Sequence, residues 1–146
     1  MAEGWACYAT DLMAEAGALT PLEQCAHLQG RIRLCARAIV DINLHMGRWS
    51  IEECAAFYER RAGTPAGAAL AEAVKNSMFP GTALMYLMGT EAIHALRRDL
   101  AARDSGFTLR GFHDSFLAWG SIPVSVIAAH MKGEDPFVAR PAEAAR

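Results

Sequence analysis

Polar side chains recur at four-residue intervals in one regular stretch of the chain, at Arg33, Arg37, Asp41 and His45. On a helix this spacing places them along one face. Asp41 can then accept a hydrogen bond from His45, and Arg37 can neutralise Asp41. A carboxylate that fixes the tautomer and orientation of a histidine is a recurrent catalytic arrangement. The spacing alone is also typical of exposed i,i+4 ion pairs, which contribute little to stability, and by itself it favours that second interpretation.

Two other candidates gain little from their immediate surroundings. Tyr86 stands in an amphipathic stretch, where a tyrosine most often packs its ring in the core and directs its hydroxyl to the surface. His113 is followed directly by Asp114, and such a dipeptide indicates no particular chemistry.

The segments that carry these residues have helical periodicity almost throughout. Thr20-Pro21-Leu22-Glu23 combines an N-cap threonine, a proline at the first helical position and a capping-box glutamate, and Ser50-Ile51-Glu52-Glu53 repeats the capping box. The sequence therefore predicts an all-α domain of about six or seven helices. They are expected over about 5–16, 21–46, 51–61, 65–75, 81–102, 109–119 and 124–131.

The longest expected helix also carries a continuous apolar seam. We expect this seam to pack inside the domain, since a coiled coil would need a longer repeat with matching charges. Its members are Cys25, Leu28, Ile32, Cys35, Ile39, Ile42 and Met46.

No C-x-x-C pair occurs among the four cysteines. They are expected to be small buried thiols in a reducing compartment. Disulfides or a cysteine metal site are the alternative.

Composition sets broad limits on the kind of protein. The 146 residues are enough for one domain with a buried core. Of all residues, 53% are hydrophobic and 21% are charged. A net charge of -2 argues against a nucleic-acid-binding surface, and the apolar runs are too short to span a bilayer. We expect a domain over residues 1–131 and a flexible tail over 132–146, in which Gly, Pro, Glu and Arg accumulate.

Four ordered segments together resemble one protein family. They are Glu3-Gly4-Trp5-Ala6, the stretch from Arg37 to His45 followed by Trp49-Ser50-Ile51-Glu52-Glu53, the stretch from Phe79 to Gly89, and the stretch from Phe112 to Pro123. Their order and spacing are similar to those of DUF885, a bacterial family related to zinc metallopeptidases. The resemblance covers roughly residues 3 to 131.

The resemblance implies a metal-dependent hydrolase of peptides or related amides. In such a protein Glu3 looks like the third zinc ligand. The helical stripe becomes a wall of the cleft, where His45, oriented by Asp41, or His113 assists the reaction. Tyr86 would stabilise the oxyanion.

The same resemblance implies a set of substrate contacts, formed by Arg37, Lys75, Asn76 and Thr82. Lys75 and Asn76 stand where the family tends to have Arg-Tyr, and Thr82 stands at a usual glutamine. Lysine does not replace arginine at a bidentate carboxylate contact. Met85 and Leu87 also replace polar residues of the family pattern, so the cleft is more apolar here.

A larger departure is that the chain contains no H-E-x-x-H. Glu3 alone does not provide the three protein ligands of a catalytic zinc site. We therefore expect the C-terminal helical part of a metallopeptidase-like protein, inactive alone, with zinc bound only if the missing ligands are supplied upstream or by a partner chain. Such a part would expose an apolar face and could form homo-oligomers.

Three alternatives remain open. The chain could be a self-standing short protein that binds a small molecule or performs metal-free acid-base chemistry in the same cleft. It could be a subunit whose partner chain carries H-E-x-x-H, or an unrelated helical interaction module. As written the sequence predicts a cytoplasmic protein, and an exported one if a signal peptide precedes it.

Overall fold

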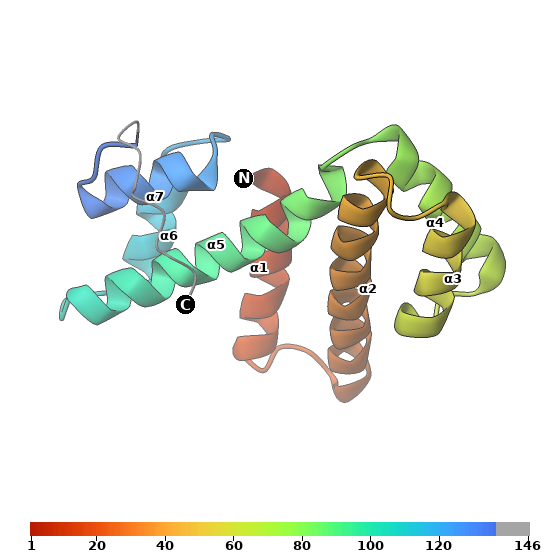
Figure 1. The fold of residues 1–146 in the computed structure, drawn as a ribbon. Helices are drawn as coiled ribbons and strands as arrows, with labels where there is room; N and C mark the ends of the chain where they lie inside the picture. The colour runs from red at the N-terminus through yellow and green to blue at the C-terminus, as the bar shows by residue number, and fades with distance from the viewer. Residues whose placement is uncertain (137–146) are drawn as a thin grey trace. The chain divides into compact units, whose positions relative to one another are not determined.

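The computed structural model describes residues 1–136, and within that range every regular element is an α-helix (Figure 1). The expected all-α fold is thus confirmed. The helices are α1 (Ala2–Glu15), α2 (Pro21–His45), α3 (Ile51–Ala62), α4 (Ala66–Met78), α5 (Thr82–Arg103), α6 (Leu109–Leu117) and α7 (Val124–Lys132). Most of the expected flexible tail lies outside the described residues.

Local capping chemistry sets the starts of α2 and α3. Thr20 accepts a hydrogen bond from the Glu23 amide while the Glu23 carboxylate accepts one from the Thr20 amide, so the predicted capping box is present. Ser50 and Glu53 form the second box in the same way. These reciprocal bonds satisfy backbone donors that a helix start otherwise leaves unpaired.

The chain divides into two compact units, and the division falls within α5. The first unit, Ala2–Glu91, contains α1 to α4 and the first part of α5. Helices α3 and α4 pack against each other and against α2. Their shared core is built from small and medium side chains together with one large aromatic ring, that of Tyr58. It consists of Ala36, Val40, Cys54, Ala55, Tyr58, Ala62, Ala69 and Ala73.

The second unit begins at Ala92 and includes the rest of α5 with α6 and α7. Phe112 and Phe116 are buried one turn apart on α6, with ring centroids 5.9 Å apart, and Ile127 of α7 is also buried. The Asp99 carboxylate of α5 pairs with Lys132 at the end of α7. The hydrogen bond from Lys132 lowers the pKa of Asp99.

The apolar seam of α2 is not buried as the sequence suggested. Leu28 is 62% exposed and Met46 is 60% exposed, and Ile32, Ile39 and Ile42 are exposed as well. The buried face of α2 instead carries Ala36, Ala38, Val40 and Asp41. Small residues let α3 and α4 approach α2 closely, so the face that packs is not the one with the largest apolar side chains.

The expectation that the cysteines are buried also fails in part, since only Cys54 is buried and Cys25 and Cys35 are exposed.

A close contact between two glycines joins α1 to α5 within the first unit. A Cβ on Gly4 would lie 2.5 Å from the Gly89 carbonyl carbon and 2.6 Å from its Cα. A Cβ on Gly89 would in turn lie 2.9 Å from the Gly4 Cα, so a side chain at either position requires the two backbones to move apart. Thr90, which is fully buried, donates from its hydroxyl to the Gly4 carbonyl at 3.3 Å and to the Tyr86 carbonyl at 2.6 Å. Gly4 is therefore required by helix packing, whatever the role of the adjacent Glu3.

We expect Gly4→Ala to lower the free energy of unfolding by about 2 kcal/mol or more, because the new methyl group must push α1 away from α5. Gly67→Ala is the matched control, since Gly67 is also helical and has open space around its Cα. That variant should be neutral or stabilised by up to about 1 kcal/mol. Urea unfolding followed by circular dichroism measures both, and equal effects would contradict the packing argument.

Candidate functional site

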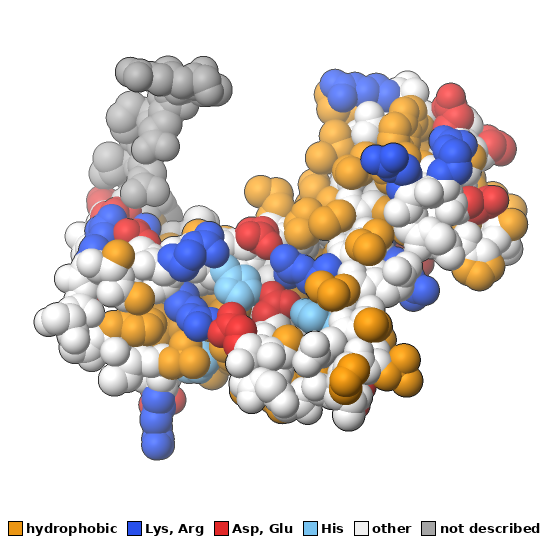
Figure 2. Space-filling view, turned by 90° about the horizontal axis from the view of Figure 1, so that it is seen from below, with side chains coloured by type: hydrophobic (Ala, Val, Ile, Leu, Met, Phe, Trp, Pro, Cys, Tyr) orange, Lys and Arg blue, Asp and Glu red, His pale blue; other side chains and the backbone are white. Residues whose placement is uncertain are grey.

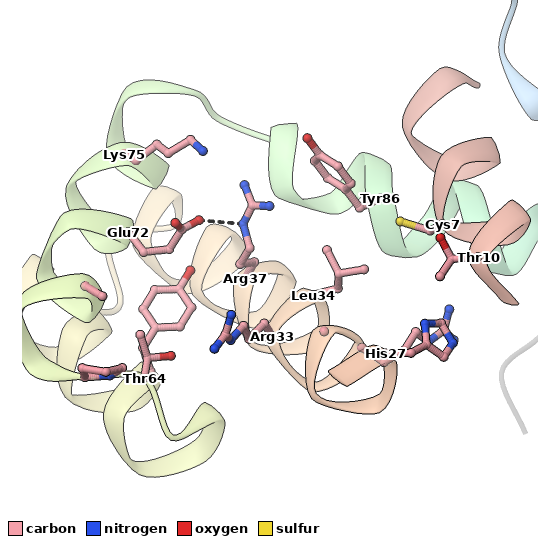
Figure 3. A pocket seen from close by; sticks show the side chains of 15 residues that line it. Cys7, Thr10, His27, Arg33, Leu34, Arg37, Thr64, Glu72, Lys75 and Tyr86 are labelled. Carbon is pink, nitrogen blue, oxygen red and sulfur yellow. Dashed lines mark ion pairs between the residues drawn. The ribbon is translucent and has the colours of Figure 1, made fainter. Parts of the chain in front are cut away.

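The first unit contains a pocket of about 620 Å³ lined by residues of α1 to α5 (Figure 3). Three side chains that the sequence singled out meet here: Arg37 from α2, Lys75 from α4 and Tyr86 from α5. They share the pocket with Arg33 and Glu72. Three helices thus bring cationic and hydroxyl groups, together with one carboxylate, to a common space.

Arg37 is the central cation of this pocket. Its Nε lies 2.8 Å from a Glu72 carboxylate oxygen, and its guanidinium carbon lies 5.1 Å from the Tyr86 ring centroid. An ion pair and a cation–π contact therefore fix the guanidinium from two sides. The sequence suggested that Arg37 would neutralise Asp41, and this was wrong: the partner is Glu72, which α4 brings across the pocket.

A second charged group borders the pocket near α1. Arg31 pairs with Asp11 at 3.2 Å and with Glu91 at 2.8 Å, and His27 lies 3.0 Å from Asp11. These ion pairs join α1, α2 and α5 of the first unit. Arg31 is thus already neutralised by two carboxylates.

Asp41 is 2% exposed and performs a structural task. Its two carboxylate oxygens accept hydrogen bonds from the amides of Gly81 at 3.0 Å and Ala83 at 3.1 Å. These amides belong to the start of α5, where unpaired backbone donors and the helix dipole favour a negative charge. Asp41 consequently anchors the first turn of α5 to α2.

His45 is held in the same network. Its Nε2 lies 3.0 Å from the Asn76 carbonyl oxygen and 3.4 Å from Asp41 Oδ1, so the expected contact between Asp41 and His45 exists. Because a carbonyl and a carboxylate are both acceptors, Nε2 must carry a proton. That nitrogen cannot act as a base while these contacts last. The pair links the end of α4 to α2, away from the residues that line the pocket.

Asn76 is likewise committed to other protein groups. It is 4% exposed, and its side-chain amide donates to the Tyr58 hydroxyl at 2.7 Å. Burial, followed by the nearby Glu72 carboxylate, raises the pKa of Tyr58 well above its usual range. Tyr58 therefore stays neutral, and its ring forms part of the pocket wall.

Three other predicted site residues, Glu3, Thr82 and His113, are not among the residues that line this pocket. Thr82 is the first residue of α5 and its amide bonds the Phe79 carbonyl at 3.2 Å. Glu3 lies in the first turn of α1 and is not among the residues lining the pocket. His113 belongs to α6 in the second unit, next to the Phe112 ring at 5.5 Å. Burial and the Arg97 guanidinium lower the pKa of His113.

Zinc was expected only with ligands supplied from upstream or by a partner chain. Among the described residues no group of three or more His, Cys, Asp or Glu side chains could hold a metal ion. Glu3 offers one ligand where catalytic zinc takes three from the protein.

Sequence reasoning missed several residues of the pocket, above all Glu72, Tyr58 and the role of Arg33. Arg33 carried a usable signal, since it lies one turn before Arg37 on the same stripe. Glu72 and Tyr58 carried none, because their position at the pocket follows only from the packing of α3 and α4 against α2.

A family described as bacterial proteins of unknown function, DUF885, matches residues 1–131. The chain belongs to the DUF885 family. The resemblance found in the sequence is thereby confirmed over nearly the same range. No curated protein matches this DUF885 chain. In the described residues no helix is both long and apolar enough to span a membrane.

A solved structure is also similar to this DUF885 chain. It is the crystal structure of a candidate lipoprotein from Colwellia psychrerythraea, with 31% sequence identity and a TM-score of 0.84. The similarity covers 90% of this chain but 23% of that one. The chain therefore spans about a quarter of the length of this relative.

We expect Asp41→Asn to lower the free energy of unfolding by about 2 kcal/mol, because charge-assisted hydrogen bonds to the start of α5 are lost in a buried position. Asp114→Asn is the control, since Asp114 is 74% exposed and its ion pair with Arg110 is long, at 3.7 Å. This substitution should lower the free energy of unfolding by less than about 0.5 kcal/mol. Chemical denaturation measures both. Equal costs would mean that Asp41 does not anchor α5 in this DUF885 protein.

His113 should make stability depend on pH. Its folded-state pKa is lowered from the ordinary value of 6.5, so the unfolded chain binds the proton more readily. The stabilisation of the folded chain by neutral His113 is fully present above pH 6.5. It is lost as the pH falls from 6.5 through the folded-state pKa. His113→Gln should therefore lose less stability than the parent chain between about pH 7 and pH 5. Urea unfolding at both pH values tests this, and identical losses would refute it.

Proposed function

We propose that this chain is the substrate-binding helical part of a DUF885 peptide or amide hydrolase and forms one wall of its cleft. The observation that carries the proposal is the meeting of Arg37, Lys75 and Tyr86 from three helices at one pocket of about 620 Å³. A volume of this size suits a small ligand or a few residues of a peptide. The catalytic metal ligands expected from the family resemblance would come from residues outside this chain.

Tyr86 is the group on this wall best suited to assist hydrolysis. Attack on an amide carbonyl develops negative charge on oxygen, and a fixed hydroxyl donor lowers the barrier when it meets that charge. The Tyr86 ring is held against the Arg37 guanidinium, which Glu72 fixes in turn. The hydroxyl is thereby restrained before substrate arrives. Asp41 and His45 do not line the pocket. They would act as positioning residues, because they hold the start of α5 and the end of α4 against α2.

The exposed seam of α2 supports the view that this wall belongs to a larger fold. Leu28, Ile32 and Ile39 are exposed, and together with Phe57 they line a second, apolar hollow of about 630 Å³ on the same unit. Hydrophobic side chains are visible at the surface of the molecule beside charged ones (Figure 2). A contiguous apolar surface of this kind usually marks an interface. We assign it to helices of the DUF885 fold beyond these residues, in keeping with the 23% of the solved relative that this chain spans.

The solved relative is described as a candidate lipoprotein. By analogy, the longer protein containing this chain would be exported, with its cleft outside the cytoplasm. Zinc and peptide substrates would then be met in that compartment.

The decisive experiment begins with the genomic DNA upstream of the Met1 codon. An in-frame segment encoding H-E-x-x-H should be found, and the longer protein should hydrolyse peptides or amides in the presence of zinc, whereas residues 1–146 alone should not. A stop codon just upstream, with no such motif in a neighbouring reading frame, would contradict the proposal. A monodisperse chain that binds ligands without turnover would then favour a self-standing binding protein.

In the active longer protein, Tyr86→Phe should lower kcat by about 100-fold while KM changes little, because the hydroxyl is used mainly when charge develops on the substrate oxygen. Tyr8→Phe is the control: Tyr8 is buried in α1 and does not line the pocket. It should leave both constants unchanged. Steady-state kinetics on one peptide substrate provides the measurement, and a change confined to KM would remove Tyr86 from the proposed role.

A further inference from the structure

Basic side chains outnumber acidic ones around the pocket of the first unit. The residues that line it include Arg31, Arg33, Arg37 and Lys75 on the basic side and Glu72 on the acidic side. A concave site with an excess of one charge concentrates ligands of the opposite charge. The site is therefore suited to an anion, and the next question is which cations are free to bind it.

Two of the four cations are already engaged. Arg37 is paired with Glu72 at 2.8 Å, and Arg31 is paired with Glu91 at 2.8 Å and Asp11 at 3.2 Å. A ligand that recruited either of them would have to compete with an existing ion pair. Their main effect is to shape the pocket and to hold its helices together.

Arg33 and Lys75 have no ion-pair partner among the described residues, and both are exposed. They come from different helices, α2 and α4, and flank the ion pair of Arg37 and Glu72 on two sides (Figure 3). An anion bound by them breaks no existing pair. Arginine offers a planar fork that matches a carboxylate, and lysine adds a mobile point charge.

Apolar side chains also line the pocket, beside polar ones such as Thr64. Leu34 from α2 and Pro65 and Ala68 at the start of α4 line the same pocket. This surface would be covered by a hydrocarbon group and would gain little from a small, strongly hydrated anion. The ligand should therefore combine a negative group with an apolar body.

We infer that this pocket takes ligands carrying a carboxylate on an apolar body, and that the unpaired cations Arg33 and Lys75 attract the carboxylate from either side of the Arg37–Glu72 pair. The inference rests on the proposed function in taking this pocket as the substrate site. It adds the substrate class: peptides with a free C-terminal carboxylate next to an apolar side chain. A small apolar carboxylic acid presents the same chemistry, and the experiment separates these two sources.

Isothermal titration of residues 1–146 with three probes tests the inference. The probes are acetyl-alanyl-leucine with a free carboxylate, the same dipeptide as its C-terminal amide, and 4-methylpentanoate, which keeps the acid and the apolar group but has no peptide bond. The free dipeptide should bind about tenfold more tightly than its amide, and its affinity should fall as salt is raised. Tighter binding of 4-methylpentanoate than of the dipeptide would identify a small acid as the source and overturn the peptide assignment.

Arg33→Gln and Lys75→Gln should each weaken binding of the free dipeptide by about tenfold and bring it close to that of the amide. Arg60→Gln is the control, because Arg60 is an exposed arginine of α3 outside the pocket lining. It should bind like the parent chain. Both pocket variants alter exposed side chains, so circular dichroism should show an unchanged fold.

Equal affinity for acid and amide, unchanged binding by both pocket variants, or binding of none of the probes would overturn the inference. Binding and turnover are separable outcomes. Carboxylate-dependent binding in a longer protein that hydrolyses no peptide would contradict the proposed hydrolase function but support the carboxylate site. Hydrolysis of the acid and the amide with equal efficiency would support the hydrolase function and contradict the carboxylate site.

Discussion

The arrangement of the first unit depends on one buried carboxylate. Asp41, at 2% exposure, accepts hydrogen bonds from the amides of Gly81 and Ala83 and so attaches the first turn of α5 to the C-terminal part of α2. Tyr86 lies one turn further along α5, and Arg37 lies one turn back along α2. The contact between the Arg37 guanidinium and the Tyr86 ring follows from this anchor. A negative charge suits this position because it faces the positive end of a helix dipole.

The same contacts separate residues that look catalytic from residues that can reach a ligand. His45 and Asn76 attract attention in the sequence, but the first donates to a backbone carbonyl and the second to the Tyr58 hydroxyl. Buried polar groups must find partners, and these two have found them within the protein. Arg33 and Lys75 have no such partner among the described residues and line the pocket, so they retain charge that is available to a ligand.

Packing explains two features of this DUF885 chain that the sequence does not. Gly4 and Gly89, from segments that resemble family motifs at opposite ends of the unit, meet backbone to backbone. Each of these motif segments thus contains a glycine that is required by helix packing, beside residues that could take part in a reaction. The large apolar side chains of α2 are exposed, whereas its Ala and Val face is buried. The exposed apolar face is the surface assigned above to contacts with the rest of the longer fold, of which this chain spans 23% in its solved relative.

The sequence by itself determined the all-α class, the helices and their starts, because capping boxes and helix-ending glycines act through neighbours a few residues away. It also indicated the DUF885 family and brought Arg37, Lys75 and Tyr86 to notice. Only the tertiary structure decided that Glu72 is the partner of Arg37 and that the seam of α2 is exposed. It also committed Asp41 to the start of α5. These outcomes depend on contacts between residues far apart in the chain, such as Asp41 with Gly81 and Gly4 with Gly89. Spacing along one helix cannot reveal them, because it does not specify which face its neighbours will cover.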